Sequence, residues 1–173
     1  MCDIKKRLMF SSSDDPYYMC FWILITLDRL GKRNGSYFND SRKLLFIILL
    51  LSDTKTFDSI IKSTEFNASK QEKEILYESY KDGVTQITRF NSLLITLEKR
   101  GLITLRKSKS LDTLDLTLNK DVIPKEFFSK KEFGNEYEKI KKLKSSVERI
   151  TALSLDTFIE RVYKNNGVKT WHV

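Results

Sequence analysis

The stretch LEKRGLITLRKSKSLDTLDLTL, residues 97–118, decides the fold expected for this chain. Its first four residues end a predicted helix that begins at Thr85. Gly101 follows, and glycine adopts the left-handed conformation in which many helices end more readily than a residue with a Cβ atom. Apolar residues recur every three or four positions along this helix, as one buried face requires. They are Ile87, Phe90, Leu94 and Leu97.

After Gly101 the apolar period changes to two. Residues 102–107 are predicted as one strand, residues 108–110 as a polar turn and residues 113–118 as a second strand. Leucines alternate with polar residues in the second strand, so one face is expected to lie on the helices and the other to face solvent. The inward residues are Leu114, Leu116 and Leu118, and the outward residues are Thr113, Asp115 and Thr117.

This order predicts a winged helix-turn-helix. A helix from residue 67 or 69 to about 80 is expected, then a turn at residues 81–83, then the helix from Thr85 and the hairpin. Residues 97–103 are similar to the helix-to-wing junction of many bacterial winged-helix regulators, and the resemblance covers residues 82–119. It implies a fold and leaves function open, because winged helices serve as DNA readers and as protein–protein modules.

Residues 14–66 are predicted to form an N-terminal helical part, after a flexible start at residues 1–13. The first helix opens at Asp14-Asp15-Pro16, where acidic side chains and proline suit a helix start, and it ends at Gly31 as its C-terminal cap. Two further helices are expected, at residues 41–52 and 56–63.

Two apolar runs in this part, residues 17–27 and 44–51, were tested as membrane spans. Each is shorter than the ~20 apolar residues that cross a bilayer. Both are therefore predicted to be buried core helices, and no membrane is expected among the partners.

Residues 122–173 are predicted to form a C-terminal helical extension, after a winged-helix part at residues 67–121. A short helix at residues 125–129 and a long one at residues 135–164 are expected. The long helix carries an apolar seam with coiled-coil-like spacing, so it can pack on the domain, pair with its copy or bind a partner's helix. The seam consists of Ile140, Leu143, Val147 and Ile150. The expected fold class is mainly α with a small antiparallel β-hairpin: a winged helix-turn-helix with extra N-terminal helices and a long C-terminal helix.

The charge of the chain suits a polyanionic partner, either nucleic acid or an acidic protein surface, although exposed lysine also serves solubility. There are 31 Lys and Arg against 23 Asp and Glu, a formal net charge of +8. If the helix from Thr85 enters the major groove of double-stranded DNA, its side chains would reach bases and the wing would reach phosphates. The alternative is that these are ordinary solvated positions. The candidate DNA-binding residues are Gln86, Arg89, Asn91, Lys99, Arg100, Arg106, Lys107 and Lys109.

The first helix is rich in aromatic residues. Such a cluster is either part of the core, which is the favoured interpretation, or a docking surface for another chain. The candidate partner-binding residues are Tyr17, Tyr18, Phe21 and Trp22, together with the seam of the C-terminal helix.

Catalytic chemistry is sparse in this sequence. The only histidine is His172, and neither Cys2 nor Cys20 lies near a histidine or in a CxxC spacing. Neither cysteine has an identifiable activating partner. We therefore expect no enzyme, no cofactor, no metal and no disulfide, and a location in the reducing cytoplasm.

The layout of residues 14–120 resembles the small middle components of bacterial three-component antiviral defence systems built around an SMC/Rad50-like ATPase, of which Lamassu is the best-known type. An aromatic helix after Asp15-Pro16, the helix at 44–51 after a basic loop, and the junction at 97–103 carry the resemblance. It implies a non-catalytic accessory subunit. Such a subunit binds the ATPase near its head or adjoining coiled coil and helps hold a nuclease effector inactive until foreign DNA is sensed.

The leading hypothesis is therefore an accessory subunit of an SMC-like ATPase complex, with the ATPase and a nuclease effector as partners and with DNA as a further candidate. About eighty residues of helical material precede the recognition-like helix, which favours an assembly subunit. The alternative is a winged-helix transcriptional regulator that binds DNA and dimerises through its C-terminal helix.

Overall fold

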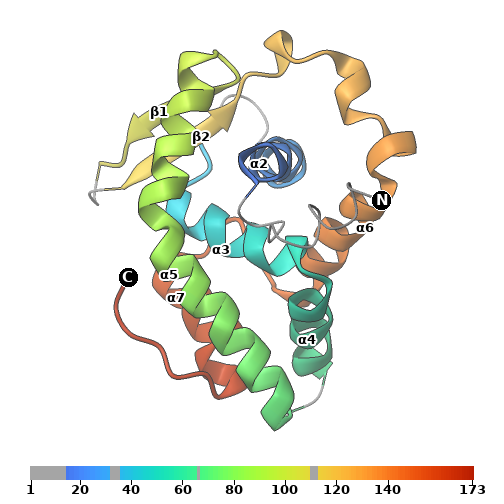
Figure 1. Cartoon of the computed structure of the whole chain (residues 1–173), viewed down its shortest axis with the longest axis vertical. Helices are drawn as coiled ribbons and strands as arrows, with labels where there is room; N and C mark the ends of the chain where they lie inside the picture. Colours follow the sequence, from blue (N-terminus) through green and yellow to red (C-terminus); the bar gives the residue numbers. More distant parts are fainter. Residues whose placement is uncertain (1–14, 32–35, 66, 110–112) are drawn as a thin grey trace, which may run out of the picture.

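The computed structural model describes residues 15–31, 36–65, 67–109 and 113–173, which are mainly helical with one two-stranded antiparallel sheet (Figure 1). The start at residues 1–13 and most of the basic loop lie outside the described residues. The main elements are α2 (Pro16–Leu30), α3 (Ser41–Ser52), α4 (Thr54–Glu65), α5 (Lys70–Lys99), β1 (Ile103–Lys107), β2 (Leu114–Leu118), α6 (Lys130–Ser146) and α7 (Leu155–Val162). Short 3₁₀ helices span Lys120–Val122, Lys125–Phe128 and Lys164–Asn166.

Helix α2 begins and ends where the sequence predicts. The Asp15 carboxylate caps it by accepting a hydrogen bond of 2.9 Å from the backbone N–H of Tyr17. Gly31 ends the helix for a different reason than expected, because its φ is −58° and not left-handed. A Cβ atom there would lie 2.2 Å from the carbonyl oxygen of Leu27. Glycine is required at this end for space.

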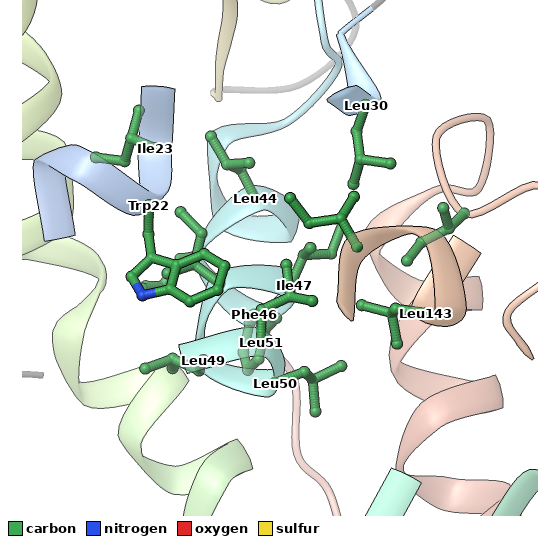
Figure 2. Packing of buried hydrophobic residues seen from close by; sticks show 14 of the residues in the cluster. Trp22, Ile23, Leu30, Leu44, Phe46, Ile47, Leu49, Leu50, Leu51 and Leu143 are labelled. Carbon is green, nitrogen blue, oxygen red and sulfur yellow. The ribbon is translucent and has the colours of Figure 1, made fainter. Parts of the chain in front are cut away.

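Helix α3 is the centre of the fold, as its apolar sequence predicts. Every residue from 44 to 51 is buried. Helix α3 contacts α2, α4, α5, α6 and α7, and Figure 2 shows Trp22 and Ile23 of α2 and Leu143 of α6 around its side chains. A helix that is apolar on all sides is stable only where other elements cover every side, which is the centre of a small domain.

The prediction of two helices with a turn at residues 81–83 is wrong, because α5 runs through these residues. It is one helix of 30 residues, opened by a capping box in which Ser69 and Glu72 bond each other's backbone N–H groups. Gly83 lies inside it, and a Cβ atom there would lie 2.2 Å from the ring of Phe46. This glycine allows α5 to approach α3 closely, which a sequence cannot distinguish from a turn.

The two predicted strands are confirmed. Ile103 pairs with Leu118, and Leu105 with Leu116, in an antiparallel register. Phe38 adds an antiparallel bridge on the other side of β2, with both of its backbone bonds to Leu116 formed. This single bridge lies beside the two-stranded sheet, and the sequence did not predict it.

One face of β2 differs from the prediction. Asp115 was expected to face solvent, but only 6% of it is exposed. Its carboxylate accepts a hydrogen bond from the backbone N–H of Asp40 at 3.1 Å and pairs with Arg106 at 3.2 Å. Leu116 is fully buried, and Leu114 and Leu118 are half-buried.

The prediction of one long C-terminal helix at residues 135–164 is wrong. Helix α6 ends at Ser146, Arg149 has a positive φ of 56°, and Ser154 caps the start of α7. The buried Lys43 holds the intervening turn by donating hydrogen bonds to the carbonyl oxygens of Thr151 and Leu153, at 3.1 and 2.7 Å. The chain therefore bends back onto α3 where the sequence pattern predicts a continuous helix.

None of the described helices is both long enough and apolar enough to span a membrane.

Candidate nucleic-acid interface

Hydrogen bonds join the end of α5 to the hairpin at one corner of the domain. Gly101 has a φ of 74° and turns the chain into β1. The Glu98 carboxylate accepts a hydrogen bond of 2.8 Å from the backbone N–H of Leu105. The Asn119 side-chain amide donates to the carbonyl oxygen of Gly101, also at 2.8 Å. The backbone of the hairpin is therefore tied to the end of α5.

Basic side chains gather at this corner. Lys99 and Arg100 lie exposed at the end of α5, and Lys107 and Lys109 lie exposed toward the tip of the hairpin. They lie at the helix end and in the hairpin, and their contact with DNA stays a prediction. We call these four residues the wing cations. Exposed lysine and arginine on one edge suit contact with phosphates, which is electrostatic and independent of base sequence.

Arg106 belongs to the same corner but serves the hairpin. Its guanidinium pairs with the buried Asp115 and lies 4.0 Å from the centre of the Tyr37 ring. A cation placed over an aromatic face and paired with a carboxylate is already occupied. We therefore separate Arg106 from the wing cations.

The predicted base-reading residues are not brought together on one face. Gln86 and Arg89 line a groove of about 200 Å³ whose other wall is the start of α2, at Asp15, Pro16 and Met19. Asn91 lies on another side of α5, where its side-chain oxygen accepts a 3.4 Å hydrogen bond from the Ser41 hydroxyl.

Helix α2 therefore lies beside the face of α5 that would enter a DNA groove. Three hydroxyl groups on α5 also bond to carbonyl oxygens of their own helix, which occupies their donors. They belong to Thr85, Ser92 and Thr96. The geometry supports contact with phosphates more than reading of bases.

The aromatic residues of α2 have mixed surroundings. Tyr17 is 82% exposed, whereas Trp22 is buried. Tyr18 and Phe21 are half-buried: the Tyr18 hydroxyl donates to the Ser52 carbonyl at 3.1 Å, and the Phe21 ring lies 4.8 Å from that of Phe133. This cluster is mostly part of the chain's own packing.

The seam of the predicted C-terminal helix lies in the core of the same chain. All of its side chains are at most 5% exposed, so they do not face a partner in this fold. They are Ile140, Leu143, Val147 and Ile150.

Exposed aromatic residues also occur outside the predicted partner-binding positions. Trp171 is 46% exposed and Tyr77 is 38% exposed, and their ring centres lie 6.4 Å apart. Residue type alone would have flagged Trp171, but nothing in the sequence spacing relates it to Tyr77. The buried polar roles of Lys43 and Asp115 were also missed, because both depend on backbone groups far away in the sequence.

The titratable groups with shifted pKa values reflect packing. Burial raises the pKa of the half-buried Cys20 thiol, which lowers its thiolate fraction and hence its reactivity. Burial likewise raises the pKa of the Tyr80, Tyr137 and Tyr163 hydroxyls. Among the residues that the structure describes, no group of three or more histidine, cysteine or acidic side chains is placed to hold a metal ion.

No protein-family model, curated protein or solved structure matches this chain.

Proposed function

We propose that this chain is a non-catalytic accessory subunit of a cytoplasmic antiviral assembly built on an SMC-like ATPase with a nuclease effector. In this proposal the chain has a winged-helix core, and the wing cations lie against the backbone of double-stranded DNA. The other helices contact the protein partners.

The observation that carries the winged-helix part of the proposal is the isolated bridge between Phe38 and Leu116. It brings extended backbone between α2 and α3 against the second strand of the hairpin, the place where a winged helix has a short strand. Helix α4 is then an insertion, and α5 is a lengthened form of the helix that precedes the wing. The assembly with an ATPase and a nuclease rests on the resemblance of residues 14–120.

The charge distribution supports a role near DNA. Lys99, Arg100, Lys107 and Lys109 are exposed at one corner of a chain with a net charge of +8. A winged helix that binds through its corner and wing contacts phosphates without needing a free recognition face. This agrees with the position of α2 beside Gln86 and Arg89.

The additional helices support an assembly subunit over a simple regulator. The dimeric regulator requires a surface for its second copy, and the seam expected to supply one is buried inside the chain. Helices α4, α6 and α7 all pack against α3 and add helical surface beyond the winged-helix order. The resemblance to the middle components of SMC-based defence systems covers residues 14–120 and so includes α4.

Co-purification tests this proposal. The tagged full chain is expressed with its neighbouring genes, and the proposal expects an SMC-like ATPase and a nuclease to remain bound in high salt. A wing variant with Lys99, Arg100, Lys107 and Lys109 changed to alanine should retain these partners and lose DNA. A monodisperse single protein, with no ATPase gene in the neighbourhood, would overturn the assembly proposal.

A further inference from the structure

The last described segment has no regular secondary structure and lies on the outside of the domain beside α5. Residues 168–173, which we call the strap, follow Gly167, whose positive φ of 79° turns the chain back toward α5 (Figure 1). The backbone N–H of Trp171 donates to the Tyr80 hydroxyl at 3.2 Å, and that hydroxyl donates to the carbonyl oxygen of Trp171. The two rings meet edge to face with centres 4.9 Å apart.

The strap is also fastened to the start of α3. The guanidinium of Arg42 donates to the carbonyl oxygen of Val173 at 2.8 Å. Its other two nitrogens donate to the Asp40 carboxylate at 3.0 and 2.8 Å. One planar group thus joins the strap to Asp40, and lysine lacks the fork needed to make these bonds at once.

Asp40 in turn contacts the second strand of the hairpin. Its backbone N–H donates to the buried carboxylate of Asp115 in β2, which pairs in turn with Arg106 in β1. Asp40 holds a φ of 66°, a conformation that residues with a side chain seldom adopt. Such a conformation persists only where its surroundings determine it, and the bonds from Arg42 are among those surroundings.

We propose that seating of the strap sets the position of the wing through Arg42, Asp40 and Asp115. Releasing the strap removes one acceptor from Arg42, loosens the conformation of Asp40 and weakens the hold of Asp115 on β2. Arg42 and Trp171 are then positioning residues for the wing. The coupling itself needs no ligand, whereas its effect on DNA binding rests on the proposed function.

Hydrogen exchange of the full chain without DNA tests the coupling. Two variants release the strap: Trp171→Ala removes the ring that packs on Tyr80, and Arg42→Lys keeps the charge without the fork. The reporters are the amides of Asp40 and Leu116, which bond to Asp115 and Phe38. Both should exchange about tenfold faster, the factor expected for one lost charge-assisted hydrogen bond.

The matched control is Arg161→Ala. Arg161 also donates to a backbone carbonyl, that of Glu148 at 3.2 Å, on an exposed part of the chain away from the strap. Exchange at Asp40 and Leu116 should not change in this variant. Amides at residues 44–51 report global unfolding in all three variants.

Unchanged exchange at Asp40 and Leu116 in Arg42→Lys would overturn the coupling, and so would faster exchange confined to the strap in Trp171→Ala. If Trp171→Ala lowers protection throughout the chain, the milder Trp171→Leu variant replaces it, because Arg42→Lys also removes the direct bonds from Arg42 to Asp40. Binding to a DNA duplex is measured in parallel. A wild-type chain that does not bind DNA contradicts the proposed function and leaves the exchange result as it stands.

Discussion

Helix α3 and the hairpin β1–β2 differ in how deeply they are buried and in what holds them in place. Residues 44–51 of α3 are buried on every side, whereas the hairpin buries only Ile103, Asp115 and Leu116. The helix is held by apolar contact, and the hairpin is held by backbone pairing and the ion pair between Arg106 and Asp115. Stability should therefore depend on α3 and binding on the hairpin corner, so that substitutions separate the two.

The largest expected effect is in the core. Phe46 is fully buried, and its ring lies 5.7 Å from that of Tyr80 and 6.0 Å from that of Tyr163. Phe46→Ala should lower the free energy of unfolding by about 3–5 kcal/mol, because it leaves a cavity between rings that cannot close. Urea unfolding followed by circular dichroism measures this. A loss similar to that of a surface alanine variant would contradict the central place given to α3.

A smaller effect tests the contact between α3 and α5. Gly83→Ala places a Cβ atom 2.2 Å from the Phe46 ring, so overpacking should cost about 1–3 kcal/mol. If residues 81–83 formed a turn or an open helix, alanine would be neutral or would stabilise α5 by up to about 1 kcal/mol. The double variant Phe46→Leu with Gly83→Ala should recover part of the loss relative to its two parents.

This glycine shows where sequence reasoning succeeds and fails. Caps such as Asp15 and Ser69, and the alternation in residues 113–118, are local signals, and they led to the correct helix starts and to the correct second strand. The role of Gly83 becomes clear only from its contact with Phe46, which lies on another helix. The break after Ser146 is similar, because Lys43 bonds residues 108 and 110 positions away in the sequence and so holds the turn that interrupts the apolar seam.

The candidate site could be predicted only where its residues depend on local signals. The cations beside the glycine and in the strands had to fall at one corner, because a hairpin follows the helix directly. Gln86 and Asn91 were chosen by helix phase alone. Phase could not foresee that the start of α2 would line the groove beside one of them and that Ser41 would bond to the other.

A modest effect is expected at the start of α5, far from both the core centre and the wing. Ser69→Ala removes the hydroxyl that accepts from the Glu72 backbone N–H and should cost about 1 kcal/mol. The loss is measured by thermal unfolding at neutral pH. DNA binding should not change, and a change would show that the two ends of α5 are not independent.

The same capping box has a pH dependence. The hydrogen bond from the Ser69 backbone N–H lowers the pKa of the Glu72 carboxyl below its ordinary value. Its contribution to stability is therefore present above the ordinary glutamate pKa and is lost as the pH falls through the lowered pKa. Glu72→Gln should reduce this acid-side slope in thermal unfolding, and an unchanged slope would contradict the assignment.

The smallest effect on stability should come from the wing cations. Changing Lys99, Arg100, Lys107 and Lys109 to alanine removes exposed side chains and should leave urea unfolding unchanged. The matched control removes an equal charge from exposed positions elsewhere. It changes Lys131, Lys141, Lys142 and Lys144 of α6 to alanine.

Salt-dependent binding of these two variants to a fluorescent DNA duplex tests the central claim most directly. For the wild type, log K should fall steeply with log salt, with a slope of about −0.9 for each phosphate contact. The wing variant should bind more weakly with a shallower slope, by roughly 0.9 for each contact removed, while the α6 variant keeps the wild-type slope. Equal losses in both variants, or wild-type binding without a salt dependence, would contradict the assignment of DNA contact to the wing.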